Sequence, residues 1–275
     1  MKRKWIRWVS WILLTPIILF VILMVLLYVP PVQNLLRREV TAYASKATGM
    51  QIQVERIDLR FPLNLLVRGV EVIQQPDTLL SLESLNVRVQ AWPLIKGKVE
   101  VDEVTLSRVA VNSANLMEGM KIKGVLGRFF LQSHGVDLSN ELAVINQVEL
   151  SDTHMQLLMN DTTTTPKDTT ASAPINWKVA LHQLKLKNVS FSMQLPADSM
   201  RMTAHIGEAA INDAQADLKN QYYDLKKFLL LGTSASYDTG TAQPAEGFDA
   251  SHIAVRDIRI ALDSLLYKGR DMNAV

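Results

Sequence analysis

Five histidines are the side chains in this sequence best suited to metal binding or proton transfer. They stand far apart along the chain, at His134, His154, His182, His205 and His252. Three of them, His154, His182 and His205, fall in segments with the alternating pattern of strands, so a sheet could gather them around a metal ion. A lone histidine in a strand is more often solvated or hydrogen-bonded, and we expect no metal site.

Acid/base and nucleophilic chemistry have equally little support. Asp102 and Glu103 are adjacent in a predicted strand, where successive side chains point to opposite faces and cannot work as an acid/base pair. The sequence has no nucleophile elbow, zinc-protease motif, P-loop or dinucleotide-binding motif, and it has no cysteine. We therefore expect a protein that is not an enzyme and that uses no cofactor.

Regularly spaced apolar residues offer a different chemistry, the solvation of apolar ligands. In six segments two apolar residues alternate, two turn-like residues follow, and two more apolar residues alternate. Residues from three of these segments are the candidates for the lining of an apolar groove: Val67, Val70, Val104, Leu106, Val109, Val111, Leu184, Leu186, Val189 and Phe191.

We interpret the two central residues of each segment as the turn of a β-hairpin. The residues that flank a two-residue turn lie opposite each other, so all four apolar residues of a segment would project from one face. Gly, Asn or Asp at the second turn position, present in four of the six, suits the positive φ of a type I′ turn. The six pairs are Arg68-Gly69, Ser107-Arg108, Ser151-Asp152, Lys187-Asn188, Asn212-Asp213 and Asp263-Ser264.

A fold dominated by strands must position these segments. From Met50 onward apolar residues recur at every second position, as in Ile52 and Val54. Residues 50–275 are predicted to form a β-rich domain, an antiparallel meander of roughly 15 to 19 strands that extends ~70 to 90 Å. Residues 160–174, which are rich in threonine, and residues 237–247 are expected to be exposed loops, although the first could also link two domains.

The N-terminus carries a predicted membrane anchor. Residues 8–29 are a run of 22 residues without a charge, which as a helix spans the ~30 Å hydrocarbon core of a bilayer. Trp8, Trp11 and Tyr28 stand where interfacial aromatic residues belong, and a helix in a membrane tolerates Pro16. A cleavable signal peptide is the alternative, but its apolar region would be shorter and would end in small residues.

Charge indicates the orientation of the anchor and argues against one class of partner. Four basic residues lie within residues 1–7, against Arg37 and Arg38 after the apolar run, which places residues 1–7 in the cytoplasm and the body in a periplasm or lumen. Of 29 Lys and Arg, 25 remain outside this basic tail, against 27 Asp and Glu. A nearly neutral body has no electrostatic basis for binding nucleic acid.

Residues 30–49 predict a juxtamembrane amphipathic helix. Pro30 and Pro31 end the apolar run, and Gly49 supplies a C-cap. We favour a helix that packs against the end of the following sheet, and the alternative is a lid or plug at the membrane surface. Its apolar residues at helical spacing are Val32, Leu35, Leu36, Val40 and Tyr43.

The order of these N-terminal features resembles a known family. A basic start, one span, Pro-Pro, a short helix that ends at Gly49, and then MQIQVERIDLRFPLNLLVRGVEV and TLLSLESLNVRVQAWPLIKGKVEVDEVTLSRVAVN are similar to the N-terminal region of AsmA-like proteins, most closely those of the TamB type. The resemblance is densest over residues 2–112, and residues 93–97 (PLIKG) are its most distinctive short piece. Farther along it rests on the recurring apolar pattern.

The resemblance implies an elongated, curled antiparallel sheet, open along one side like a taco shell. Such a protein is anchored in the inner membrane of a Gram-negative cell, and its periplasmic groove carries membrane phospholipids between the inner and outer membranes. TamB-type members are longer and engage an outer-membrane barrel partner through a C-terminal domain that has no counterpart in this sequence. The resemblance therefore also implies that the chain is the N-terminal part of a longer protein.

Other interpretations stay open at this point. The alternating pattern alone favours an ordinary sandwich core, whereas the predicted anchor and the family resemblance favour the open groove. Two other functions also fit the sequence. The chain could be an assembly factor that guides outer-membrane β-barrel proteins or adhesins by strand addition at a sheet edge, or a passive scaffold of the envelope.

Overall fold

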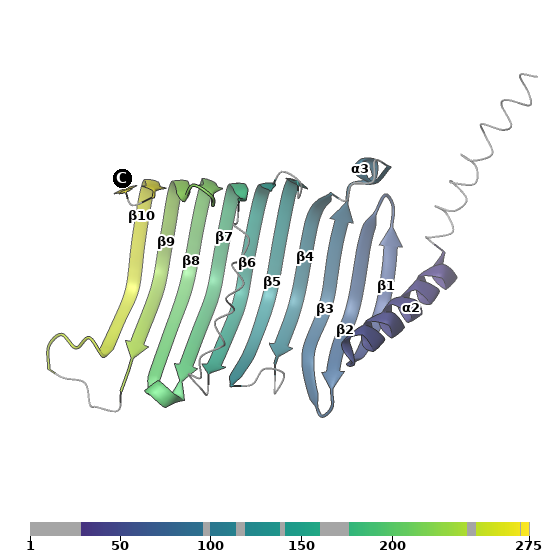
Figure 1. Ribbon diagram of the computed structural model, residues 1–275, viewed down its shortest axis with the longest axis horizontal. Helices are drawn as coiled ribbons and strands as arrows, with labels where there is room; N and C mark the ends of the chain where they lie inside the picture. Colours follow the sequence, from purple (N-terminus) through teal and green to yellow (C-terminus); the bar gives the residue numbers. More distant parts are fainter. Residues whose placement is uncertain are drawn as a thin grey trace, which may run out of the picture.

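The chain folds as one long sheet with a helix at one end (Figure 1). The computed structural model describes residues 29–95, 100–113, 119–137, 141–159, 176–240, 246–269 and 271–274. Within these ranges helix α2 (Pro30–Thr48) comes first, and eleven strands then lie side by side in sequence order. The strands are β1 (Gln51–Arg60), β2 (Asn64–Gln74), β3 (Asp77–Val89), β4 (Val101–Asn112), β5 (Met120–Asp137), β6 (Leu142–Met159), β7 (Lys178–Leu195), β8 (Met200–Asp217), β9 (Tyr222–Asp238), β10 (His252–Lys268) and β11 (Asp271–Ala274). Two short helical pieces, α3 (Ala91–Ile95) and the 3-10 turn η1 (Pro196–Asp198), connect β3 to β4 and β7 to β8.

The prediction of a mainly β chain with a short N-terminal helix is confirmed, but the strands are fewer and longer than expected. β5 to β10 have 17 or 18 residues each. The described residues form eleven strands, which at the usual spacing of ~4.8 Å extend roughly 48 Å, so this part of the chain has fewer strands and a shorter sheet than the expected 15 to 19 strands. The sheet is also not wholly antiparallel, because β6 and β7 pair in parallel.

The six predicted hairpin turns are wrong as well, because all six pairs lie inside continuous strands. The expected backbone conformation is nevertheless present at five of them. The second residues Gly69, Arg108, Asp152, Asn188 and Asp213 have φ between 46° and 58°. A left-handed residue therefore bends each strand where a chain reversal was predicted.

Most of these bends fall in a single row that crosses the sheet, which we call the kink row. The ladders on either side of each position place its members opposite one another: Glu55, Gly69, Glu83, Arg108, Gly127, Asp152, Asn188, Gly207 and Gly232. At Gly127 the neighbouring strand comes so close that only glycine fits. A Cβ there would lie 2.7 Å from the Cβ of Asp152. In β10 the left-handed residue Asp257 (φ 52°) lies outside this row, at the register shift between Val255 and Ile258.

Polar contacts join neighbouring members of the kink row. Arg108 forms an ion pair with Glu83, and the Asn188 amide donates a hydrogen bond of 2.8 Å to Asp152 Oδ1. A left-handed backbone conformation costs free energy at Arg108 and Asp152, because neither is glycine. The ion pair and the hydrogen bond offset part of this cost. The row thus combines a backbone bend with polar side chains over most of the length of the sheet.

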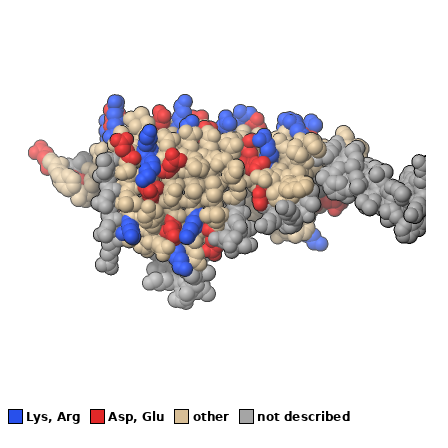
Figure 2. All heavy atoms as spheres, turned by 90° about the horizontal axis from the view of Figure 1, so that it is seen from above, with Lys and Arg blue, Asp and Glu red and all other residues tan. Residues whose placement is uncertain are grey.

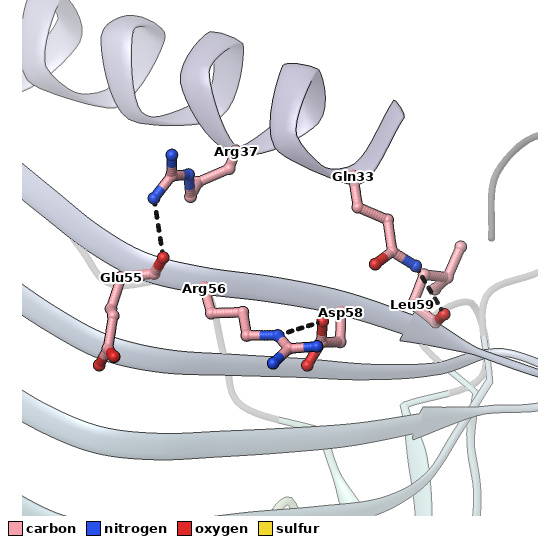
Figure 3. A network of polar contacts seen from close by, with 6 residues as sticks. All are labelled: Gln33, Arg37, Glu55, Arg56, Asp58 and Leu59. Atoms are coloured by element: carbon pink, nitrogen blue, oxygen red, sulfur yellow. Dashed lines mark hydrogen bonds and ion pairs between the residues drawn. The ribbon is translucent and has the colours of Figure 1, made fainter. Parts of the chain in front are cut away.

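Helix α2 lies along the outer edge of β1 (Figure 3). As predicted, it ends at a C-cap, where Gly49 has a left-handed conformation (φ 70°) and its N–H donates to the Ser45 carbonyl. Polar side chains of α2 bond to the free edge of β1: Gln33 Nε2 donates to the Leu59 carbonyl at 3.0 Å, and Arg37 Nη1 to the Glu55 carbonyl at 2.8 Å. The Ile52 N–H donates to Ser45 Oγ at 3.0 Å, so α2 closes this edge to another strand.

Several predicted segments lie outside the described residues. They are the basic tail at residues 1–7, the anchor at residues 8–28 with Trp8, Trp11, Pro16 and Tyr28, and the loop at residues 160–174. Of the other predicted loop, residues 241–245 are not described, whereas Tyr237 and Asp238 belong to β9, which makes that loop shorter than expected. Within the described ranges, none of the helices has the length and apolar character needed to cross a membrane.

The kink row predicts an unusual order of stability among substitutions. At Arg108 (φ 46°), Arg108→Val should be less stable than Arg108→Gly by ~1 to 2 kcal/mol, because a β-branched residue fits the left-handed conformation poorly. Arg88 is the matched control, since it also forms a strand ion pair, with Glu103 at 3.1 Å, but has no positive φ. There Arg88→Val should be the more stable variant by roughly 1 kcal/mol. Denaturant unfolding measures both differences, and the same order at both sites would contradict the bend.

Candidate functional site

Four rows of mainly apolar residues, interrupted by Thr153 and Thr233, cross the sheet from β1 to β10, two on each side of the kink row. The two rows on one side contain Ile57, Val67, Leu85, Leu106, Phe129, Leu150, Leu186, Ala209, Leu230, Ile260 and Leu59, Leu65, Val87, Val104, Leu131, Val148, Leu184, Ile211, Phe228, Leu262. The two rows on the other side contain Val54, Val70, Leu82, Val109, Leu126, Thr153, Val189, Ile206, Thr233, Ile258 and Ile52, Val72, Leu80, Val111, Gly124, Met155, Phe191, Ala204, Ala235, Val255. Four rows of ten give forty positions, and none of them carries a charge.

The spacing of apolar residues changes phase at the kink row. In β7, Leu184 and Leu186 alternate before Asn188, and Val189 and Phe191 alternate after it. In a regular strand, residues an odd number apart face opposite sides of the sheet. The alternation is interrupted at the kink row and resumes one position later in β1 to β9, and a left-handed residue marks the interruption in β2, β4, β6, β7 and β9.

Much of the surface of these rows is accessible to solvent. Val111, Phe191 and Val255 are exposed, with relative accessibilities of 37%, 41% and 46%. Among the residues that the structure describes, the buried apolar ones are Ile57, Leu79, Leu82, Ala143 and Ala209, and no large side chain is fully buried. The core of a two-layer sandwich would instead bury such residues almost completely.

A second protein layer over the rows is absent from the described part of the chain. Each strand makes extensive contacts only with its neighbours in the sheet, and α2 contacts only β1 to a comparable extent. β1 and β10 do not pair, so the described strands do not close into a barrel. The sandwich that the alternating pattern alone favoured is therefore not formed by these residues.

All ten residues predicted from the sequence to line a groove lie in the four rows, including Val67, Val104, Leu184 and Phe191. The sequence interpretation did not recognise the members contributed by β5 and β9, such as Phe129, Leu131 and Leu230. Their signal was the same alternation, but no segment of β5 or β9 was recognised by it. The interpretation also missed the edge contacts of Gln33, Arg37 and Ser45, because they depend on the position of β1.

Charged side chains flank this apolar region. Figure 2 shows a band of uncharged atoms along the length of the sheet, with most of the visible Lys, Arg, Asp and Glu toward its two borders. The residues that alternate with the apolar rows include Lys185 and Glu149, whose charged atoms are 3.9 Å apart. The sheet is thus amphipathic along its whole length.

The histidines make isolated polar contacts. His182 Nδ1 is 3.0 Å from Asp213 Oδ1, and His205 Nδ1 is 3.0 Å from Ser190 Oγ. His154 lies opposite Ser190 on the other side, so β7 separates it from His205. In the described ranges, no group of three or more His, Asp and Glu side chains is arranged to hold a metal ion.

A shallow hollow of about 220 Å³ lies beside His182 and is lined by Asp213, Gln215, Asp224 and Lys226. A hydrogen bond of 2.8 Å with Asp224 raises the pKa of Lys226 above its ordinary value, and the electrostatic attraction of Asp224 adds to this shift. Lys226 is therefore a paired cation at neutral pH, which makes it a poor general base. The hollow is thus lined by two polar pairs on an exposed surface, Lys226 with Asp224 and His182 with Asp213.

Comparison of the sequence with models of known protein families and with curated protein sequences found no match.

An uncovered apolar row predicts that truncating its side chains costs little stability. Phe191→Ala should cost about 1 kcal/mol, well below the ~3 to 5 kcal/mol of a buried phenylalanine. Leu82→Ala is the control in a neighbouring row, because Leu82 is only 9% exposed and its loss should cost ~2 kcal/mol or more. Denaturant unfolding of the full chain measures both. A cost for Phe191 that exceeds the cost for Leu82 would mean that another layer covers this residue.

Proposed function

We propose that this protein carries phospholipids along an apolar trough between the inner and outer membranes of a Gram-negative cell. In this proposal residues 8–29 anchor the chain in the inner membrane, residues 1–7 are cytoplasmic and the sheet is periplasmic. The observation that carries the proposal is the set of four charge-free rows, continuous over ten strands and uncovered by the described residues. The resemblance to AsmA-like proteins of the TamB type supports the same function.

The kink row is what makes a trough of the sheet in this proposal. Because the alternation resets at each left-handed residue, the rows on both sides of the bend share one face and form two walls. Polar residues such as Arg108 and Asn188, together with their partners Glu83 and Asp152, lie at the bend on the other face. The sheet thereby gains a concave apolar side and a convex polar side.

Physical chemistry favours transfer along such a trough. Each methylene removed from water is worth ~0.8 kcal/mol, so apolar walls offset the cost of lifting acyl chains out of a bilayer. The same four rows recur at every strand, so a bound chain meets an equivalent surface after each step of ~4.8 Å. Binding free energy then changes little along the trough, and a lipid slides without any covalent step.

Photocrosslinking at adjacent residues tests this function. p-Benzoylphenylalanine placed at Leu186, in an apolar row, should capture phospholipid in cells. The matched control is Lys187, the next residue, which is exposed and alternates with the rows. The double variant Leu106→Asp, Leu186→Asp should lose lipid capture at Val189 while keeping its circular dichroism spectrum. Equal capture at Leu186 and Lys187, or capture that the aspartates leave unchanged, would rule out the trough.

A second candidate function rests on the edge of β10. Within the described residues, β11 pairs with residues 265–268 of β10 only, so residues 252–264 have no strand partner on that side. Free backbone groups on an edge strand accept an added strand, which is how an assembly factor for outer-membrane barrels or adhesins would work. In that case crosslinkers at Arg256 or Arg259 would trap polypeptide, and Leu186 would trap no lipid.

A further inference from the structure

Helix α2 presents two sides of opposite character. The residues that bond to the edge of β1, namely Gln33, Arg37 and Ser45, are polar. They are four and eight residues apart, which places them within an arc of about 120° that forms one stripe along the helix. The hydrogen bonds that attach α2 to the sheet therefore come from polar residues, and the apolar residues Leu35, Val40 and Tyr43 lie on another side of the helix.

Those apolar residues remain exposed. Leu35, Val40 and Tyr43 have relative accessibilities of 57%, 46% and 77%. At 3.6 residues per turn they fall within an arc of about 140° that adjoins the polar stripe. The same arc contains Glu39 and Lys46, both exposed, so at a membrane surface their charged ends would extend to the headgroups and water. In the part of the chain that the structure describes, β1 is the one element that α2 contacts extensively, so these residues have no protein cover there.

The sequence before α2 indicates what covers them. Pro30, the first residue of the helix, directly follows the charge-free run at residues 8–29. If that run spans a bilayer, α2 begins at the membrane surface. Two cations, Arg38 and Lys46, and one acid, Glu39, are exposed on α2, which leaves one net positive charge.

We infer that α2 lies on the surface of the membrane in which residues 8–29 are anchored, with Leu35, Val40 and Tyr43 buried at the boundary between headgroups and acyl chains. This inference rests on the anchored topology of the proposed function. Interfacial helices combine an apolar side, an aromatic residue and cations at headgroup level, all of which α2 has. The adjoining span keeps α2 at the surface, so its apolar side needs to supply only a modest part of the binding free energy.

The position of α2 then sets the orientation of the sheet. α2 lies at one end of the long axis of the molecule and closes the β1 edge, while β10 lies at the other end (Figure 1). A helix held on the bilayer therefore places the β1 end of the four apolar rows next to the membrane. The rows extend from there away from the bilayer, strand by strand, toward β10.

Site-directed spin labelling tests the inference directly, because the chain has no cysteine and each variant has a single labelling site. The full-length chain is reconstituted in liposomes of phosphatidylethanolamine and phosphatidylglycerol. Nitroxides at Leu35→Cys and Tyr43→Cys should be several-fold more accessible to oxygen than to a water-soluble nickel chelate. Two controls, Asn34→Cys on another side of α2 and Arg256→Cys on β10, should show the reverse preference.

Each other outcome overturns the inference in a distinguishable way. Water-like accessibility at Leu35 and Tyr43 in incorporated protein would show that α2 lies off the membrane, and lipid capture at Leu186 would then still support the trough. Spin–spin coupling between Tyr43 labels would show that a second copy covers the helix. Failure of the chain to incorporate into liposomes would remove the anchor and the inference together, while lipid capture at Leu186 would again test the trough separately.

Discussion

An amphipathic sheet one layer thick must find something apolar for its uncovered side, and this constraint governs the rest of the molecule. Forty row positions without a charge would normally be buried between two layers of protein, and half-exposed residues such as Val111 and Phe191 show that the described chain supplies no such layer. Exposed apolar patches of this extent mark binding surfaces in soluble proteins. In the proposed function, acyl chains, which are apolar, long and mobile, occupy this side.

The kink row gives this sheet its particular form. A flat amphipathic sheet would expose its apolar side to any partner, including another copy of itself, whereas in the proposed trough the bends at the kink row enclose that side between two walls. The left-handed backbone at non-glycine residues such as Arg108 and Asp152 costs free energy that a flat sheet would not require. The two edges of the sheet also differ. Gln33, Arg37 and Ser45 of α2 form hydrogen bonds with backbone groups of β1, whereas residues 252–264 of β10 have no strand partner on their outer side among the described residues.

Sequence patterns predicted the apolar rows well and the chain path poorly. Alternation identified residues such as Val104 and Leu184 because side-chain direction in a strand is a local property. Polar pairs such as Lys187-Asn188 were taken for hairpin turns because a positive φ and a polar residue are common to a type I′ turn and to a bend within a strand. What separates the two is long-range pairing: Leu184 lies opposite Ile211 of the next strand rather than Phe191 of its own segment. The parallel pairing of β6 with β7 was missed for the same reason, since it depends on the return path of the chain.

Native mass spectrometry of the full-length chain, released from a mild detergent after extraction from cells, tests most directly whether lipid occupies the uncovered side. We expect phospholipid to be bound to the wild-type protein and to stay bound under gentle collisional activation. We also expect a marked loss of these adducts when aspartates replace facing members of the rows in a protein that stays folded. Wild-type protein that is free of lipid, or that carries another polypeptide over its apolar rows, would contradict the proposed trough.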